Sequence, residues 1–177
     1  MPGATDTHRL FFALWPDGRT REALAKLQAA LPLRGGRPMR SENIHLTLAF
    51  IGDVDGDTRD CLIRQARGVR AAPLAFAIER VGHFPRPGVV WVGPQRTPDA
   101  LIELVAGLNA ALAPCGYQPE RRPFRAHLTL FRKVARPPRP LDFAPIEWPV
   151  EAFCLVESLP EEGGVRYAVI EQFPLAG

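Results

Sequence analysis

The tetrapeptide His45-Leu46-Thr47-Leu48 recurs as His127-Leu128-Thr129-Leu130, 82 residues further along the chain. In a strand, alternate side chains point to opposite faces, so the two leucines of each copy share one face and the histidine and threonine share the other. Each copy therefore predicts a strand with one apolar face and one polar face. We expect these strands over residues 43–51 and 126–131.

The similarity extends to the residues that precede each tetrapeptide. Shifting the sequence by 82 residues aligns residues 16–48 with residues 98–130, and nine of the 33 aligned positions are identical. The leucine stripe of the first segment falls one residue away from that of the second, so the repeat is imperfect. It still predicts two related lobes, because self-similarity at a fixed spacing indicates repeated structural units.

Between and around these strands the chain alternates short helical and extended patterns. Apolar residues with helical spacing predict helices over residues 19–31, over residues 61–69 and from Pro98 onward. Further strands are expected over residues 9–15, in a hairpin of residues 74–81 with 89–92, and in a terminal hairpin of residues 150–157 with 165–171. A proline-rich connection is expected over residues 134–149. The pattern favours a mixed α and β fold.

Length and composition limit the classes of protein that fit. A chain of 177 residues with 46% hydrophobic and 23% charged residues predicts one globular domain over residues 1–177 and excludes a disordered or fibrous protein. The 19 prolines and 15 glycines disfavour a bundle of long helices. The apolar run of residues 10–15 is far shorter than the roughly 20 residues of a membrane helix, and no signal-peptide pattern follows it. We expect a cytoplasmic protein.

Three cysteines, Cys61, Cys115 and Cys154, are scattered along the chain. Their odd number and the absence of a Cys-x-x-Cys spacing favour neither a disulfide framework nor a thiolate zinc site. We expect all three to be free thiols that are buried or unreactive.

The net charge of +3 conceals a basic segment. Residues 121–139 contain seven cationic residues and no acidic one, so the rest of the chain sums to 3 − 7 = −4. A run of charge is most often a solvated surface. This run surrounds the second tetrapeptide, which favours a polyanionic partner bound through its phosphates.

Two imidazoles facing one cleft suit a particular chemistry. One can remove a proton from a nucleophile while the other protonates a leaving oxygen, and an ordinary pKa of about 6.5 allows one ring to be neutral and one charged near neutral pH. Threonine hydroxyls can donate hydrogen bonds to oxygens that gain negative charge. Phosphodiester cleavage fits these roles.

Other interpretations of the histidines carry less weight. A single His-x-Thr is most often a strand with a structural histidine, but the repetition counts against that interpretation. Each motif offers one good metal ligand, and no carboxylate or third histidine has ligand spacing, so we expect no metal. Of the remaining histidines, His83 is expected to be structural and His8 to lie on the surface.

At this level the sequence resembles the two-histidine (2H) phosphoesterases, and within them the bacterial RNA 2′,3′-cyclic phosphodiesterases once named 2′-5′ RNA ligases. The doubled His-x-Thr is the specific part of the resemblance. The supporting segments are residues 9–14, 43–52, 84–93, 122–130 and 158–175. The resemblance implies an α+β fold of two pseudo-symmetric lobes, with antiparallel sheets lining a central cleft and helices outside.

The resemblance also implies roles for individual residues. His45 and His127 are the expected catalytic pair. The expected substrate-binding residues are Thr47, Thr129 and Arg132, which face the phosphate, and the cleft aromatics Phe12 and Phe84. Relatives often have proline before the second histidine where this chain has Ala126. No cofactor is implied.

The implied activity is metal-independent hydrolysis of a 2′,3′-cyclic phosphate on RNA or a nucleotide, with a 2′-phosphate as product. The motif does not say which histidine is the base. It also does not separate hydrolysis from 2′-5′ RNA ligation, and a non-catalytic module that binds RNA ends or nucleotides is the alternative outside enzymes. The expected partners are RNA ends or cyclic nucleotides, with no membrane, and a monomer is the expected state.

Overall fold

The structure is a computed structural model that describes residues 6–177. Two strand–helix–strand units contain the repeated tetrapeptides. The first consists of β1 (His8–Leu14), α1 (Gly18–Ala30) and β3 (Leu46–Val54), and the second of β6 (Val89–Gly93), α3 (Asp99–Leu112) and β7 (Leu128–Arg132). The two units correspond to the repeat seen in the sequence.

The other elements extend these units. The strands are β2 (Arg37–Pro38), β4 (Leu74–Ile78), β5 (Arg80–Phe84), β8 (Ile146–Val150), β9 (Ala152–Glu161) and β10 (Gly164–Pro174). The helical elements are α2 (Gly56–Ala66) and the short 3₁₀ turns η1 (Ser41–Asn43) and η2 (Ala113–Cys115).

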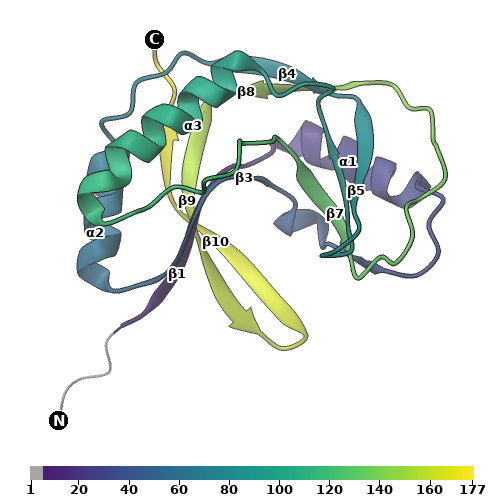
Figure 1. The fold of residues 1–177 in the computed structure, drawn as a ribbon, viewed down its shortest axis with the longest axis horizontal. Helices are drawn as coiled ribbons and strands as arrows, with labels where there is room; N and C mark the ends of the chain where they lie inside the picture. The colour runs from purple at the N-terminus through teal and green to yellow at the C-terminus, as the bar shows by residue number, and fades with distance from the viewer. Residues whose placement is uncertain (1–5) are drawn as a thin grey trace.

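One sheet runs through both lobes in the order β10-β9-β1-β3-β7-β6-β5, with β2 paired to β7. The central strands β3 and β7 are antiparallel and share a single registered pair, Leu46 with Leu128. In Figure 1 the sheet bends at this point into an arch, with α2 and α3 outside one limb and α1 outside the other. This architecture agrees with the expected pair of lobes around a central concave face.

The helices cross from one unit to the other. Helix α1 follows β1 along the chain but reaches β7, where the Gln28 side chain donates to the backbone oxygen of Leu130 at 2.9 Å. Helix α3 follows β6 but packs against α2 and β3 in the opposite limb (Figure 1). Each central strand therefore contacts the helix of the other unit.

The leucines of the two tetrapeptides lie in the core. Leu46, Leu128 and Leu130 are fully buried, and Leu48 is 5% exposed. They pack with the apolar face of α3, whose residues Leu101, Leu104, Val105, Leu108 and Leu112 are all buried. Because side chains alternate along a strand, the histidines and threonines face the concave side.

Several predicted boundaries differ from the structure. The second helix begins at Gly56 instead of residue 61, because the Asp55 carboxylate accepts a hydrogen bond from the Thr58 backbone nitrogen at 2.8 Å and caps it. The expected strand over residues 74–81 is two strands: β5 forms the expected hairpin with β6, while β4 pairs with β8 in a separate two-stranded sheet. Residues 146–149 of β8 lie inside the segment expected to be an irregular connection, and Val150 was expected to begin the terminal hairpin.

The interpretation of the cysteines as three free thiols is wrong for two of them. Cys61 on α2 and Cys115 in η2 form a disulfide, with their Cα atoms 5.8 Å apart. Their 54-residue separation gave no sign that the two elements are neighbours. Cys154 is free and buried, as expected, and burial raises the pKa of its thiol to about 12.

His8 also differs from its predicted place on the surface. It is 7% exposed, its Nδ1 atom lies 2.8 Å from the carboxylate of Glu157 on β9, and its Nε2 atom lies 3.0 Å from the Arg59 guanidinium. His83 fits the expected structural role, because its Nε2 atom lies 3.1 Å from the backbone oxygen of Val134. Among residues 6–177 no helix combines the length and apolar character needed to cross a lipid bilayer.

Candidate active site

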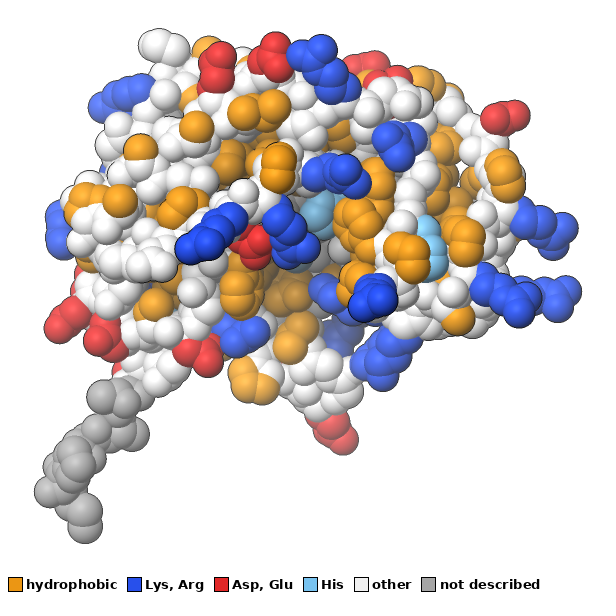
Figure 2. Space-filling view, viewed as in Figure 1, with side chains coloured by type: hydrophobic (Ala, Val, Ile, Leu, Met, Phe, Trp, Pro, Cys, Tyr) orange, Lys and Arg blue, Asp and Glu red, His pale blue; other side chains and the backbone are white. Residues whose placement is uncertain are grey.

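The two tetrapeptides meet at the seam between β3 and β7. Because Leu46 pairs with Leu128 in antiparallel register, His45 is set across from Thr129, and Thr47 across from His127. The four polar side chains share the concave face in an approximately twofold arrangement. Figure 2 shows Lys and Arg side chains around the hollow on this side of the molecule, with histidine visible within it.

Backbone carbonyls fix both imidazoles in the same way. The Nδ1 atom of His45 lies 2.6 Å from the backbone oxygen of Asn43, and the Nδ1 atom of His127 lies 2.8 Å from that of Arg125. A carbonyl oxygen only accepts, so Nδ1 carries the proton in each ring. The Nε2 atom of each histidine is thus the one available for proton transfer.

His45 lies in an aromatic enclosure. Its ring stacks on Phe11 at 4.7 Å and on Trp15 at 5.5 Å between centroids, and Tyr167 meets it edge-on at 5.2 Å. Burial lowers the pKa of His45 to about 4, and the positive charges of Arg132, Arg21 and His127 act in the same direction, against the hydrogen bond to the Asn43 carbonyl.

A neutral His45 near pH 7 has one defined hydrogen-bonding pattern. Its Nε2 atom carries a lone pair and accepts from the Thr47 hydroxyl at 3.0 Å. This atom is therefore prepared to accept a proton, which is the requirement for a general base.

His127 has more open surroundings. Phe84 and Trp91 meet its ring edge-on at centroid distances of 5.3 and 6.2 Å, and no ring stacks on it within the described part of the chain. Its Nε2 atom makes no hydrogen bond to any group of residues 6–177, in contrast to the Nε2 atom of His45. That atom is therefore available to a bound ligand.

Arg132 is the last residue of β7. It is exposed, and its charge is one of those that lower the pKa of His45. It forms no ion pair or hydrogen bond with other side chains in residues 6–177. Its guanidinium is therefore available to an anion beside His45.

The structure corrects one of the two predicted cleft aromatics. Phe12 is fully buried in the core beside Phe153 and Phe173, so its expected place in the cleft is wrong. Phe11, one residue earlier, contacts His45 instead, because a shift of one residue in a strand reverses the face. Phe84 does contact His127.

Sequence reasoning missed Trp15, Trp91 and Tyr167 as parts of the histidine surroundings. The pairing of Trp91 with Thr129 on β7 puts that indole on the concave face. Tyr167 comes from the terminal hairpin, and β10 reaches the site only because β9 pairs with β1. No local pattern in the sequence marks Trp91 or Tyr167 as part of the site.

The donor set around the two imidazoles suits an anion more than a cation. In the described residues, no group of three or more His, Cys, Asp or Glu side chains is placed to hold a metal ion. The groups near His45 are aromatic rings, hydroxyls and guanidinium groups. The arrangement can accept one proton, donate another and hold a negatively charged group between them.

Comparison with known proteins gives a consistent result. The sequence matches the LigT-like phosphoesterase family twice, over residues 14–91 and 92–167. It is 31% identical to an RNA 2′,3′-cyclic phosphodiesterase of Escherichia coli over 97% of this chain and 98% of that protein. It is 35% identical to an RNA 2′,3′-cyclic phosphodiesterase of Thermus thermophilus over 96% of this chain and 91% of that protein.

Among solved structures, the fold is similar to Escherichia coli LigT complexed with 3′-AMP. The TM-score is 0.86 at 30% sequence identity, and the match covers 97% of this chain and 100% of the other. The boundary between the two family matches, at residues 91 and 92, falls within β6, where the second strand–helix–strand unit begins.

Proposed function

Because this chain belongs to the LigT-like phosphoesterase family, we propose that it is a hydrolase that opens 2′,3′-cyclic phosphate ends of RNA to 2′-phosphates. The observation that carries the proposal is the pair of His45 and His127, each held by a carbonyl so that Nε2 faces one concave surface. Relatives named RNA 2′,3′-cyclic phosphodiesterase, and a similar structure complexed with the ribonucleotide 3′-AMP, support the substrate class.

The surroundings of the two histidines suggest a division of roles. His45 is neutral at neutral pH and acts as the base: its Nε2 atom takes a proton from a water molecule as the water oxygen bonds to phosphorus. The bond between phosphorus and the ribose O3′ breaks, and His127 donates its Nε2 proton to O3′. The product carries a 2′-phosphate and a free 3′-hydroxyl, and the two histidines exchange protons with solvent before the next turnover.

Three further residues hold the phosphate in this proposal. Thr47 turns its hydroxyl from His45 to a phosphate oxygen when substrate binds, and Thr129 approaches from the neighbouring strand. Arg132 stabilises the negative charge that grows on the phosphate oxygens in the transition state. The negative substrate also raises the pKa of His45 from its low value in the free protein, which strengthens it as a base.

We take the chain as a single two-lobed domain that acts as a monomer without a metal ion. Each lobe supplies one of the two histidines, so a complete site is formed within one chain. The cationic and hydroxyl groups supply the charge stabilisation for which many phosphoesterases use a metal. Light scattering of the purified protein tests the monomer.

The test is incubation with an oligoribonucleotide ending in a 2′,3′-cyclic phosphate, in chelator and ¹⁸O-labelled water. Mass spectrometry should show one labelled oxygen on the phosphate, and chromatography against 2′- and 3′-phosphate standards should identify the 2′-phosphate. Binding of this oligonucleotide without turnover would contradict hydrolysis and favour a module that only binds RNA ends.

A further inference from the structure

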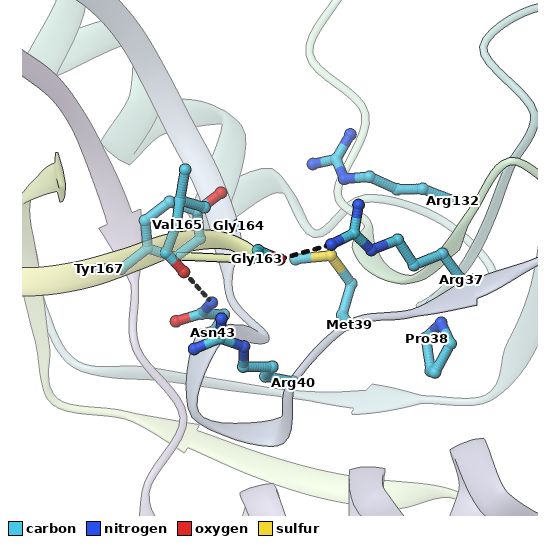
Figure 3. Close-up of a pocket in the computed structure, with 10 residues that line it drawn as sticks. All are labelled: Arg37, Pro38, Met39, Arg40, Asn43, Arg132, Gly163, Gly164, Val165 and Tyr167. Carbon is cyan, nitrogen blue, oxygen red and sulfur yellow. Dashed lines mark hydrogen bonds between the residues drawn. The ribbon is translucent and has the colours of Figure 1, made fainter. Parts of the chain in front are cut away.

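A cavity of about 260 Å³ lies next to the proposed active site. Figure 3 shows its walls: β2 and η1 on one side, the end of β7 on another, and the turn between β9 and β10 opposite them. Arg37, Arg40 and Arg132 line it, together with Asn43 and Tyr167. No acidic residue is among the lining residues; of the three arginines, Arg40 is paired with Glu161 outside the lining, and Arg37 and Arg132 have no acidic partner within residues 6–177.

The three arginines lie close together, although they come from different parts of the chain. Arg37 and Arg132 occupy directly opposed positions of the antiparallel β2–β7 pair, where like charges destabilise a sheet. A Cβ atom built on Gly164 would lie 3.5 Å from an Nη2 atom of Arg40 and 3.8 Å from that of Arg37. Two guanidinium groups from different elements therefore approach one point at the hairpin turn.

Most of the hydrogen-bonding capacity of these side chains is unused. Arg37 donates to the backbone oxygen of Gly163 at 2.6 Å, and Arg40 is paired with Glu161 at 2.8 Å. Each guanidinium has five N–H groups, so each retains several donors. Arg132 uses none within residues 6–177.

Two residues that line the cavity also contact His45. Tyr167 lines the cavity and also meets the His45 ring edge-on at 5.2 Å. Asn43 lines it too, and its backbone oxygen is the acceptor that fixes the His45 tautomer. A ligand at the proposed catalytic phosphate can therefore extend into the cavity without crossing the sheet.

We propose that this cavity binds the backbone phosphate of the RNA strand immediately 5′ to the terminal cyclic phosphate. The inference rests on the proposed function and specifies its substrate. A 2′,3′-cyclic phosphate closes the 3′ end of a strand, so the strand can extend from the site in its 5′ direction only. In this proposal Arg37 and Arg40 bind that internal phosphate. A cyclic mononucleotide has no such phosphate, so an oligonucleotide should be the better substrate.

The basic segment of residues 121–139, which favours a polyanionic partner in the sequence, contributes little to this cavity. Of its seven cationic residues only Arg132 lines the cavity. Arg139 lines a separate cavity beside β5, where the positive charges of Arg139 and Arg80 are balanced by Glu79 and Asp142. Arg136 lines neither cavity.

The experiment compares a cyclic-phosphate mononucleotide with a dinucleotide that adds one internal phosphate. For the native protein, kcat/KM should be higher for the dinucleotide. Its logarithm should also fall more steeply with the logarithm of salt concentration, by a slope of about 0.7 for one phosphate contact on a single strand. The substitutions Arg37→Gln and Arg40→Gln should each reduce the preference for the dinucleotide roughly tenfold.

Two kinds of control separate charge from structure. Arg136→Gln and Arg139→Gln remove the same charge elsewhere and should keep the preference. Glu161→Gln breaks the ion pair of Arg40 with the hairpin but leaves the cation, so it should keep the preference as well. The inference is wrong if Glu161→Gln reduces the preference as much as Arg40→Gln does. It is also wrong if the variants of Arg37 and Arg40 keep the preference as fully as the variants of Arg136 and Arg139.

A binding measurement distinguishes failure of the inference from failure of the proposed function. Fluorescence anisotropy of a labelled dinucleotide ending in a 2′-phosphate reports the cavity without chemistry. Suppose that neither substrate is turned over, but the dinucleotide binds more tightly than the mononucleotide and this difference depends on Arg37 and Arg40. That result would reject hydrolysis and retain the cavity as a phosphate site. Turnover of both substrates with equal kcat/KM and equal salt dependence would retain hydrolysis and reject the cavity.

Discussion

The His45 half of the site and the His127 half have the same tetrapeptide and the same tautomer but different surroundings. His45 is stacked between rings and hydrogen-bonded to Thr47, whereas His127 has only edge contacts and a free Nε2 atom. The repeated motif determines which nitrogen faces the cleft. The neighbouring strands determine how readily that nitrogen holds a proton, so one motif can supply two different roles.

The strongest test of this comparison removes each imidazole in turn. His45→Ala and His127→Ala should each lower kcat by roughly 10² to 10⁴, the usual contribution of one general acid or base. The double variant should cost much less than the product of the single losses, because the pair acts as a unit. Single-turnover rates measure this, with circular dichroism to verify the fold. Near-native turnover in either single variant would exclude the paired mechanism.

The comparison also predicts how stability depends on pH. The folded His45 has a pKa of about 4 against 6.5 for the unfolded side chain, so between these values the unfolded chain binds a proton that the folded chain does not. The free energy of unfolding should therefore fall as pH is lowered from 6.5 toward 4, by at most about 3 kcal/mol from this group. Urea titrations of the native chain and of His45→Gln measure the difference. An identical pH dependence in both would contradict the lowered pKa.

A smaller effect should follow from opening the aromatic enclosure. The profile of kcat/KM against pH should be bell-shaped, with its acidic limb near the pKa of about 4 that His45 has in the free protein. Phe11→Ala exposes the His45 ring to water and should move that limb upward by roughly one unit. Phe84→Ala, beside His127, is the matched control and should leave the acidic limb in place. A profile with a single limb would indicate only one titrating catalyst.

No effect is expected from removing divalent metal ions, because each half contributes an imidazole and a hydroxyl to the phosphate and Arg132 contributes a guanidinium. Activity in excess chelator should equal activity in its absence. Activity that disappears in chelator and returns with one particular divalent ion would overturn the roles proposed for Thr47, Thr129 and Arg132.

The sequence predicted those parts of the site that depend on local alternation. His-x-Thr beside buried leucines specifies a face within four residues, so His45 and His127 could be assigned without a structure. The run Leu10 to Trp15 is apolar at every position, so it contains no alternation that would separate Phe11 from Phe12. Strand β8 did alternate, with Trp148 buried between exposed neighbours, but Pro149 and the surrounding prolines favoured an irregular segment.

Features that depend on contacts between distant segments could not be predicted in the same way. The disulfide requires α2 and η2 to be neighbours, and the arginine-lined cavity requires β2 to pair with β7 while the β9–β10 turn closes one wall. The residues next to Arg37 and Arg40 in the sequence form no pattern that indicates a binding site. Only the pairing of the strands shows that they stand beside Arg132.

The crossing of the helices has a consequence for how the two repeats depend on each other. Each repeat contributes its helix to the opposite limb of the arch, as in a domain swap between two subunits, but here within one polypeptide. A fragment ending in the turn before β6 would contain α1 without β7 and β3 without α3. Each half-chain therefore lacks the helix that contacts its own central strand, so burial of the leucines of one repeat depends on the other.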